Sequence, residues 1–245
     1  MYKLLTRFIL IFCLMFQDLG FASFDHNKPK PIFSYTFLKN ETFTDHVEAF
    51  NALFKIFPTD SFLEFGMGKG TSFFISNCGY VRSIELVPLT PSGEYAEHIV
   101  AWYDQCLDLY KNCSNWSPEA YFCGQDLSDA NLIATGDHPF KKIAPPSYQK
   151  EISTLINRLF AERHYDIAFV DPGIHNRGDI VNALFNKVDI IAAHDTNYGR
   201  KVYGWNRIIP PRDYTTILFH KGCGTTFWVH NKHPDVIRHL QKCFK

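Results

Sequence analysis

The stretch SFLEFGMGKGTSFF, residues 61–74, joins a short apolar run to three glycines that are spaced two residues apart. The apolar run predicts a buried strand with an acid, Glu64, near its end. Gly66, Gly68 and Gly70 follow, and glycine permits positive φ angles and a close approach of the backbone to a ligand. The next residues open a helix, whose N-terminus favours negative charge. The stretch therefore predicts either a ligand-binding loop at the end of a strand or a plain strand-to-helix turn.

Apolar runs and helical patterns alternate along the rest of the chain. Strands are predicted at 61–65, 81–87, 120–123, 165–170 and 188–193, and a hairpin at 215–220 and 225–230. Helices are predicted at 44–57, 96–110, 148–160 and 179–185. Continuous apolar strands joined by helical crossovers imply a mostly parallel sheet that is covered by helices on both faces. The closing hairpin adds an antiparallel strand, so the sequence predicts a single α/β domain over residues 44–245.

Length and charge narrow the classes of function. The chain has 245 residues, of which 46% are hydrophobic and 20% charged, as expected of one globular domain with a sizeable core. Its 25 basic and 25 acidic residues give a formal net charge of zero. No electrostatic argument therefore favours a nucleic acid or an anionic membrane as a partner.

The N-terminus has the pattern of an export signal. Lys3 and Arg7 precede an apolar run at 8–16, and small residues follow it. The run is shorter than the about 20 residues of a membrane-spanning helix. We therefore expect residues 1–22 to be a signal peptide, with an N-terminal membrane anchor as the alternative, and residues 23–43 to be a leader segment. Cleavage of the signal would make the protein periplasmic or secreted, and no other membrane insertion is expected.

Six cysteines lie outside the predicted signal, and an even number suits an oxidising compartment. Six scattered thiols are an equal alternative, because a sequence cannot select the pairs. The six residues are Cys78, Cys106, Cys113, Cys123, Cys223 and Cys243.

The glycine loop reads ExGxGxG followed by Thr71, which stands where a dinucleotide-binding fingerprint has its third glycine. With Glu85 on the next predicted strand, this pattern resembles the cofactor-binding motifs of class I S-adenosylmethionine-dependent methyltransferases. The resemblance implies that the loop passes under the methionine part of the cofactor and that Glu64 helps to hold its amino group. It also implies that Glu85 accepts hydrogen bonds from the ribose hydroxyls and that the third strand ends near the adenine. The expected cofactor-binding residues are Glu64, Gly66, Gly68, Gly70, Thr71, Glu85, Gln125 and Asp126.

The resemblance extends over about residues 60–230. It implies a three-layer Rossmann-like sandwich with a mostly parallel seven-stranded sheet and a C-terminal antiparallel hairpin. The fourth strand, in YDIAFVDPGIH, would end with Asp171 facing the reactive methyl group, and the fifth, in VDIIAAHDT, would end near the methyl acceptor. The two histidines that follow these strands are candidate general bases, because imidazole titrates near neutral pH, and equally candidate structural residues. The expected catalytic residues are Asp171, His175, His194 and Asp195.

A metal site is a further implication of the resemblance. Metal-dependent O-methyltransferases of this family carry an Asp at the fourth strand and an Asp-Asn pair after the fifth. Here Thr196 separates Asp195 from Asn197, which departs from that pattern. A divalent cation such as Mg²⁺ on Asp171, Asp195 and Asn197 would lower the pKa of an acceptor hydroxyl. A plain hydrogen-bonding role for the same residues is the alternative.

The expected function is transfer of a methyl group from S-adenosylmethionine to a hydroxyl of a small or saccharide acceptor. Export conflicts with this function, since the cofactor is made in the cytosol. The alternative is a catalytically silent, secreted binding module on the same scaffold, because a fold alone does not establish an activity. The sequence makes no prediction of the oligomeric state.

Overall fold

The computed structural model describes residues 32–41, 43–88, 94–123, 133–134, 142–143, 146–173, 177–197 and 202–245. The predicted signal at 1–22 lies outside these ranges, as do Gln125, Asp126 and His175, so these expectations stay predictions. Among the described residues, no helix is both long and apolar enough to cross a bilayer.

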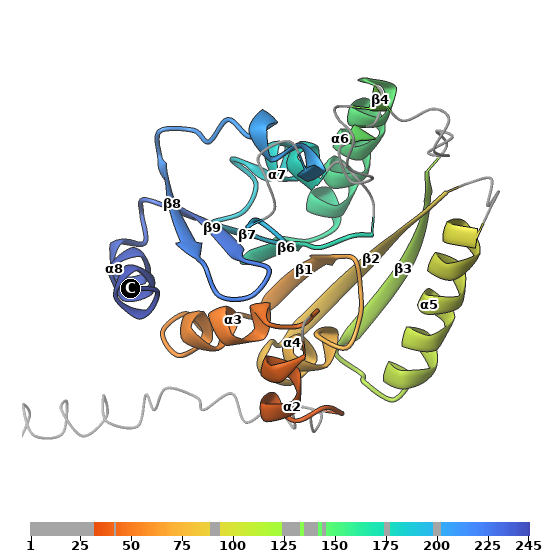
Figure 1. Ribbon diagram of the computed structural model, residues 1–245, viewed down its shortest axis with the longest axis horizontal. Coiled ribbons are helices and arrows are strands. Elements are labelled where there is room, and N and C mark those ends of the chain that lie inside the picture. The colour runs from red at the N-terminus through yellow and green to blue at the C-terminus, as the bar shows by residue number, and fades with distance from the viewer. Residues whose placement is uncertain are drawn as a thin grey trace, which may run out of the picture.

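A seven-stranded sheet forms the middle of the molecule (Figure 1). Its strands are β1 (Ser61–Phe65), β2 (Tyr80–Pro88), β3 (Trp116–Cys123), β6 (Ile167–Val170), β7 (Ile190–His194), β8 (Tyr214–Phe219) and β9 (Thr225–His230). They lie in the order β3-β2-β1-β6-β7-β9-β8. Neighbouring strands from β3 to β7 run parallel, and β9 is antiparallel to both β7 and β8. The predicted sheet, mostly parallel with a C-terminal antiparallel hairpin, is confirmed.

Helices cover both faces of the sheet and give the three layers expected. They are α2 (Tyr35–Asn40), α3 (His46–Phe54), α4 (Thr71–Asn77), α5 (Glu94–Tyr110), α6 (Pro146–Glu162), α7 (Arg177–Leu184) and α8 (Pro234–Cys243), with a 3-10 helix η1 (Val202–Arg207) and a small ribbon of β4 (Ile133–Ala134) and β5 (Lys142–Ile143). Helices α6 and α7 lie on one face of the sheet, and α3, α4, α5 and α8 lie on the other (Figure 1). Each group of helices contributes side chains to the core on its own face. Successive residues of a strand point to opposite faces, so Leu63 of β1 belongs to the first core and Phe62 to the second.

The core between α3, α4 and the sheet is built largely of phenylalanine rings. Phe62 of β1 stacks on Phe74 of α4 with ring centroids 4.3 Å apart. Phe50 of α3 meets Phe74 and Phe169 edge-on, with centroid distances of 4.9 and 5.1 Å. Burying a side chain of this size stabilises the fold by about 1.5–3 kcal/mol. The rings therefore fix α3 and α4 against β1 and β6.

Three elements differ from the sequence expectation. α2 lies within the segment expected to be a leader, and its Leu38 is fully buried. β3 begins at Trp116 rather than at Ala120 and passes through Pro118. An edge strand such as β3 tolerates proline, because one side of its backbone has no partner strand. α8 has no counterpart among the predicted helices.

The six cysteines outside the predicted signal all lie in the described ranges, and none of them forms a disulfide. Cys78, Cys106 and Cys123 are buried as thiols. Of the two alternatives left by the sequence, the structure therefore has thiols.

Candidate functional site

The carboxyl ends of β1, β2, β6 and β7 meet at one edge of the sheet. β1 lies between β2 and β6, so the chain continues to β2 on one side and reaches β6 on the other side only later. In open α/β sheets, ligands bind at such a point, where the strand order reverses. The glycine loop follows β1 at this point, which is where a ligand site is expected.

A side chain would meet different neighbours at each of the three glycines of the loop. Gly66 has a φ of +83°, and a Cβ there would lie 2.3 Å from the backbone oxygen of Asp171 at the end of β6. A Cβ at Gly70 would lie 2.6 Å from Nε2 of His46. A Cβ at Gly68 would meet the indole of Trp102 at an ordinary contact distance of 3.5 Å. Packing inside the protein thus requires two of the glycines, and Gly68 is the one that no neighbouring atom demands.

Two side chains of α5 hold the carbonyls of the loop. Trp102 Nε1 donates to Met67 O at 2.6 Å, and Tyr110 OH donates to Gly68 O at 2.6 Å. Trp102 is only partly buried, whereas Tyr110 is fully buried. The indole of Trp102 therefore borders the loop at the position where a ligand would approach Gly68.

Glu64 lies inside the protein, with 2% of its surface exposed. Its carboxyl group accepts hydrogen bonds from Ser83 Oγ at 2.6 Å and from Thr71 Oγ1 at 3.0 Å. Thr71 Oγ1 in turn accepts the Gly68 amide at 2.9 Å. Burial raises the pKa of Glu64 to about 8, although the two hydroxyl hydrogen bonds lower it. Glu64 is therefore mostly uncharged at neutral pH and ties β1 to β2 and to the loop.

Glu85 contacts the same loop from β2. Its Oε2 accepts the Met67 amide at 3.0 Å, and 3% of the residue is exposed. Burial raises the pKa of Glu85 to about 7, against the hydrogen bond from Met67, so the carboxyl group is about half ionised at neutral pH. The structure thus brings the predicted cofactor residues Glu64, Thr71 and Glu85 together at the glycine loop.

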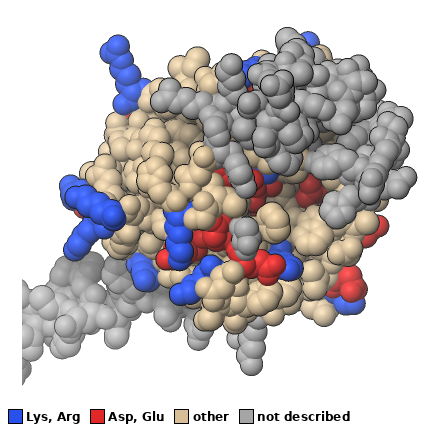
Figure 2. Space-filling model, viewed as in Figure 1, with Lys and Arg blue, Asp and Glu red and all other residues tan. Residues whose placement is uncertain are grey.

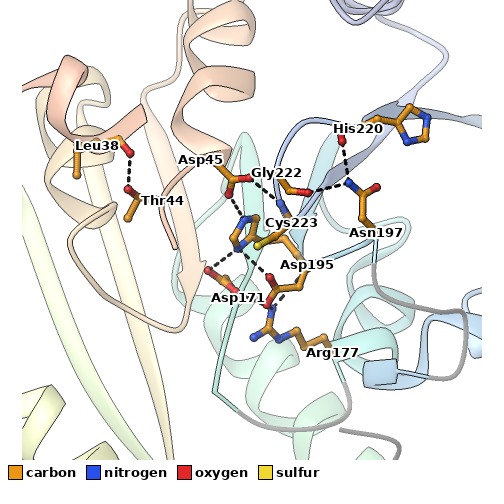
Figure 3. A network of polar contacts seen from close by, with 11 residues as sticks. Leu38, Thr44, Asp45, Asp171, Arg177, Asp195, Asn197, His220, Gly222 and Cys223 are labelled. Atoms are coloured by element: carbon orange, nitrogen blue, oxygen red, sulfur yellow. Dashed lines mark hydrogen bonds and ion pairs between the residues drawn. The ribbon is translucent and has the colours of Figure 1, made fainter. Parts of the chain in front are cut away.

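A second group of polar side chains lies at the ends of β6 and β7 (Figure 3). Arg177 Nη1 lies 2.6 Å from Asp171 Oδ1 and 2.8 Å from Asp195 Oδ2. The guanidinium carbon of Arg177 lies 4.0 Å from the centre of the Tyr203 ring. Asp195 has a φ of +64°, a left-handed conformation that Asp adopts more readily than most residues. One arginine therefore bridges the two predicted catalytic acids.

Three carboxylates enclose His194. Its Nε2 lies 2.5 Å from Asp45 Oδ1, and its Nδ1 lies 3.4 Å from Asp171 Oδ2 and 3.6 Å from Asp195 Oδ1. Burial opposes the charged ring, but the three acids outweigh it and raise the pKa of His194 to about 10. Burial likewise works against the charge of Asp171, yet Arg177 and His194 lower its pKa. The three carboxylates stabilise the protonated ring, so His194 would have to lose this proton before it could act as a general base.

His46, the first residue of α3, lies beside His194, with ring centroids 4.8 Å apart. Its ring also packs against Phe74 and Phe169, and 3% of the residue is exposed. Burial lowers the pKa of His46 to about 3, so the imidazole is neutral at physiological pH.

The metal site predicted on Asp171, Asp195 and Asn197 does not match this geometry. The guanidinium of Arg177 lies between the two carboxylates, where a cation would have to sit. The Nδ2 of Asn197 donates to two backbone carbonyls of the β8–β9 turn, at 2.8 and 3.1 Å (Figure 3). The three residues therefore do not converge on one ion, and the hydrogen-bonding alternative fits their contacts.

The glycine loop and the polar side chains at the ends of β6 and β7 together form an acidic region. Three carboxylates, on Asp45, Asp171 and Asp195, face two cations, Arg177 and His194, so three minus two leaves one negative charge. The two buried glutamates at the loop add further acid groups. Figure 2 shows acidic side chains gathered near the middle of the face in view. Such an edge attracts a cationic ligand and repels a phosphate.

Four residues at this edge are absent from the sequence prediction: Asp45, His46, Trp102 and Arg177. Asp45 and His46 begin a helix that is recognisable from its apolar spacing. The adjacent acid and imidazole are the sequence feature that could have marked them as candidate site residues. Arg177 follows the DPGIH segment closely. A cation so near a predicted catalytic acid could have marked Arg177 as a candidate site residue. Trp102 offers none, since it reaches the loop only through tertiary packing.

Comparisons with known proteins give structural neighbours only. No family model matches the sequence, and no curated protein matches it. A putative caffeoyl-CoA O-methyltransferase from Staphylococcus aureus is 13% identical, with a TM-score of 0.49 over 75% of this chain and 82% of that chain. A methyltransferase from Geobacter sulfurreducens is 13% identical, with a TM-score of 0.41 over 78% of this chain and 83% of that chain.

A methyltransferase from Podospora anserina, solved with S-adenosylhomocysteine, is also 13% identical, with a TM-score of 0.42 over 74% of this chain and 75% of that chain. At such identities and TM-scores, the chemistry of this chain has to be argued from its own residues.

Proposed function

We propose that the protein binds S-adenosylmethionine at the glycine loop and transfers its methyl group to a hydroxyl acceptor beside Asp171 and Asp195. One observation carries the proposal. Glu64 and Glu85, on neighbouring strands, contact the two ends of one loop, through Thr71 and through the Met67 amide. We infer that a cofactor would place its ribose at Glu85 and its amino group near the end of the loop that Glu64 supports through Thr71.

A cationic ligand would change the protonation state of the two glutamates. Both are buried, and burial raises the pKa of each well above the ordinary value near 4.5. A nearby positive charge would favour their ionised forms. S-adenosylmethionine carries a sulfonium and an ammonium group against one carboxylate and is therefore a net cation, whereas the pyrophosphate of a dinucleotide would bring only negative charge to the acids. The acidic edge therefore favours the sulfonium cofactor over a nucleotide.

The residues at the loop suit the parts of this cofactor. Glu85 would accept hydrogen bonds from the ribose hydroxyls, and Gly68 would let the ligand approach the backbone closely. Trp102 borders the loop, and an indole face attracts a cation such as a sulfonium. When bound, the cofactor supplies an electrophilic methyl group.

On the side where the methyl acceptor would bind, the chain holds two carboxylate groups in place, those of Asp171 and Asp195. Arg177 holds Asp171 and Asp195 in fixed orientations. A carboxylate in such a position can accept a hydrogen bond from the acceptor hydroxyl and align its oxygen with the methyl group. As the oxygen–methyl bond forms, the sulfur–methyl bond breaks, S-adenosylhomocysteine leaves, and the hydroxyl proton passes through the carboxylate to solvent. We assign this orienting role to Asp171. The acceptor would be a small molecule or a saccharide, and Arg177 rather than a divalent cation would organise the acids.

The first test is calorimetric titration with S-adenosylhomocysteine. We expect one site in the wild type and an affinity at least about 10-fold weaker in Glu85→Gln, because a hydrogen bond to a charged group contributes about 1.5–3 kcal/mol. The amide oxygen of Gln can still accept the Met67 N–H. Asp108→Asn, on an exposed acid that pairs with Lys111, is the matched control. A wild type that does not bind the ligand would refute the proposal.

The second test separates the enzyme from a silent binding module. Transfer of a labelled methyl group to a panel of sugar and aryl hydroxyls is expected to fall strongly in Asp171→Asn, with little change in cofactor affinity. Binding of the cofactor without transfer to any acceptor would favour the silent module. If residues 1–22 export the protein, as we propose from their sequence pattern, the donor must be supplied outside the cytosol.

A further inference from the structure

Within the part of the chain that the structure describes, one buried histidine has no hydrogen-bond partner for either ring nitrogen. Neither Nδ1 nor Nε2 of His46 is paired, and 3% of the residue is exposed. Buried polar side chains almost always have a partner, and an exception needs an explanation such as an ion or a water. The surrounding rings of Phe74 and Phe169 offer no conventional acceptor or donor.

Two metal-ligating side chains lie next to this ring. One atom each of Asp45, His46 and His194 lies within 4.8 Å of the other two, and all three residues are buried. His194 Nε2 and Asp45 Oδ1 are already 2.5 Å apart. The rings of His46 and His194 meet edge-on, at an angle of 71°. The three groups come from the start of α3 and the end of β7, so the fold itself brings them together.

We propose that Asp45, His46 and His194 bind a divalent transition metal ion, Zn²⁺ in the first instance. Two imidazole nitrogens and one carboxylate oxygen are a donor set that zinc takes at about 2.0–2.2 Å. The same set also suits Fe²⁺, whereas Mg²⁺ prefers oxygen ligands. To bind the ion, His194 Nε2 and Asp45 Oδ1 would separate from 2.5 Å to about 3.4 Å, the spacing of two ligands around a tetrahedral zinc, and the His46 ring would adjust to the same centre. The hydrogen now shared by His194 Nε2 and Asp45 Oδ1 would leave to solvent.

A neighbouring group of possible ligands is less suited. His194, Asp195 and Cys223 also have ligand atoms within 4.8 Å of one another. Asp195, however, is held by Arg177 at 2.8 Å, and a cation there would have to compete with the guanidinium. At the site with His46, the ion competes, among the described residues, only with the proton that His194 Nε2 shares with Asp45 Oδ1, and both nitrogens of His46 are unpaired.

The ion would connect α3 to β7 directly beside the glycine loop, because a Cβ at Gly70 would lie 2.6 Å from His46 Nε2. The inference goes beyond the proposed methyl transfer and does not depend on it. Metal binding is measured on the protein alone, without cofactor or acceptor, so failure of one proposal leaves the other intact.

The experiment uses the full chain after removal of metals by a chelator. His239 and Cys243 form an exposed pair on α8, with Nε2 and Sγ 3.5 Å apart, which could collect metal at the surface. The His239→Gln variant therefore serves as the matched background. In it we expect one equivalent of Zn²⁺ by equilibrium dialysis, a higher Tm with Zn²⁺, and a visible Co²⁺ spectrum of low-symmetry nitrogen and oxygen ligation.

His46→Phe keeps an aromatic ring in the core and removes a ligand, and Asp45→Asn keeps the shape of the carboxylate. We expect each substitution to weaken Zn²⁺ binding at least about 100-fold, more than the loss of an outer-sphere partner does. Uptake of metal that is unchanged in both variants would overturn the proposal. A metal-free background protein that takes up neither Zn²⁺ nor Co²⁺ at micromolar concentration would overturn it whether or not the variants fold.

Discussion

The glycines of the loop give the sharpest test of how the site is built. Each is replaced by alanine, and the structure predicts three different results. Gly66 has a left-handed φ, and its new Cβ would lie 2.3 Å from Asp171 O. An alanine Cβ at position 70 would lie 2.6 Å from Nε2 of His46. Gly68 has a φ outside the left-handed region, and its Cβ would meet only the Trp102 side chain at 3.5 Å.

These geometries set the expected free energies. A left-handed alanine costs about 1–2 kcal/mol, and overpacking against a fixed backbone costs about 1–3 kcal/mol more. Gly66→Ala should therefore lose about 3 kcal/mol, and Gly70→Ala about 1–3 kcal/mol from overpacking alone. Gly68→Ala should stay within about 1 kcal/mol of the wild type, since alanine at a compatible φ also restricts the unfolded chain.

Thermal unfolding provides the measurement. For a chain of this size, 3 kcal/mol corresponds to a Tm lower by about 6–12 °C. Gly204→Ala is the matched control, because Gly204 has a φ of +74° and its Cβ would meet nothing closer than Arg207 Cδ at 3.7 Å. That variant isolates the cost of the φ angle. A Gly66→Ala protein as stable as Gly204→Ala, or a Gly68→Ala protein that unfolds early, would refute the assignment of roles to these glycines.

The remaining predictions concern the charged groups. Because burial raises the pKa of Glu85 to about 7 and the bound cofactor favours its ionised form, the affinity for S-adenosylmethionine should rise between pH 6 and 8 in calorimetry; a flat profile would contradict this role, and Glu85→Gln should rise less steeply than the wild type. Because the pKa of Glu64 is about 8 in the folded protein and its ordinary value is 4.5, the folded state holds an extra proton between these values. Stability should therefore fall as pH rises, by about 1.4 kcal/mol per pH unit, and urea unfolding of Glu64→Gln should lack this contribution; equal slopes would exclude it. Arg177→Met removes the guanidinium that joins Asp171 to Asp195, leaves them only the longer contacts to His194, and should cost about 3–5 kcal/mol in urea unfolding, with a near-neutral result counting against the bridge.

Local patterns were enough to predict the sheet. The strands β1, β6 and β7 are continuous apolar runs, and the KGCG turn marks the final hairpin. The start of β3 was not predictable in this way, because Pro118 argues against a strand unless the strand lies at an edge. Its edge position depends on the order of the whole sheet.

The site was predictable only where it follows the chain. Glu64, Thr71 and Glu85 stand at fixed offsets from strand ends, so their gathering at one loop could be expected. The pairing of Asp45 with His194 joins residues 149 positions apart, and no local pattern indicates such a contact. The reasons for glycine at 66 and 70 likewise come from β6 and α3, which the sequence of the loop does not contain.

The most direct measurement is a crystal structure of the protein with S-adenosylhomocysteine. We expect the ribose hydroxyls within hydrogen-bond distance of the Glu85 carboxylate and the methionine part of the ligand against Gly68. A ligand bound elsewhere on the protein, or a loop that stays covered by Trp102 with no ligand at saturating concentration, would contradict it.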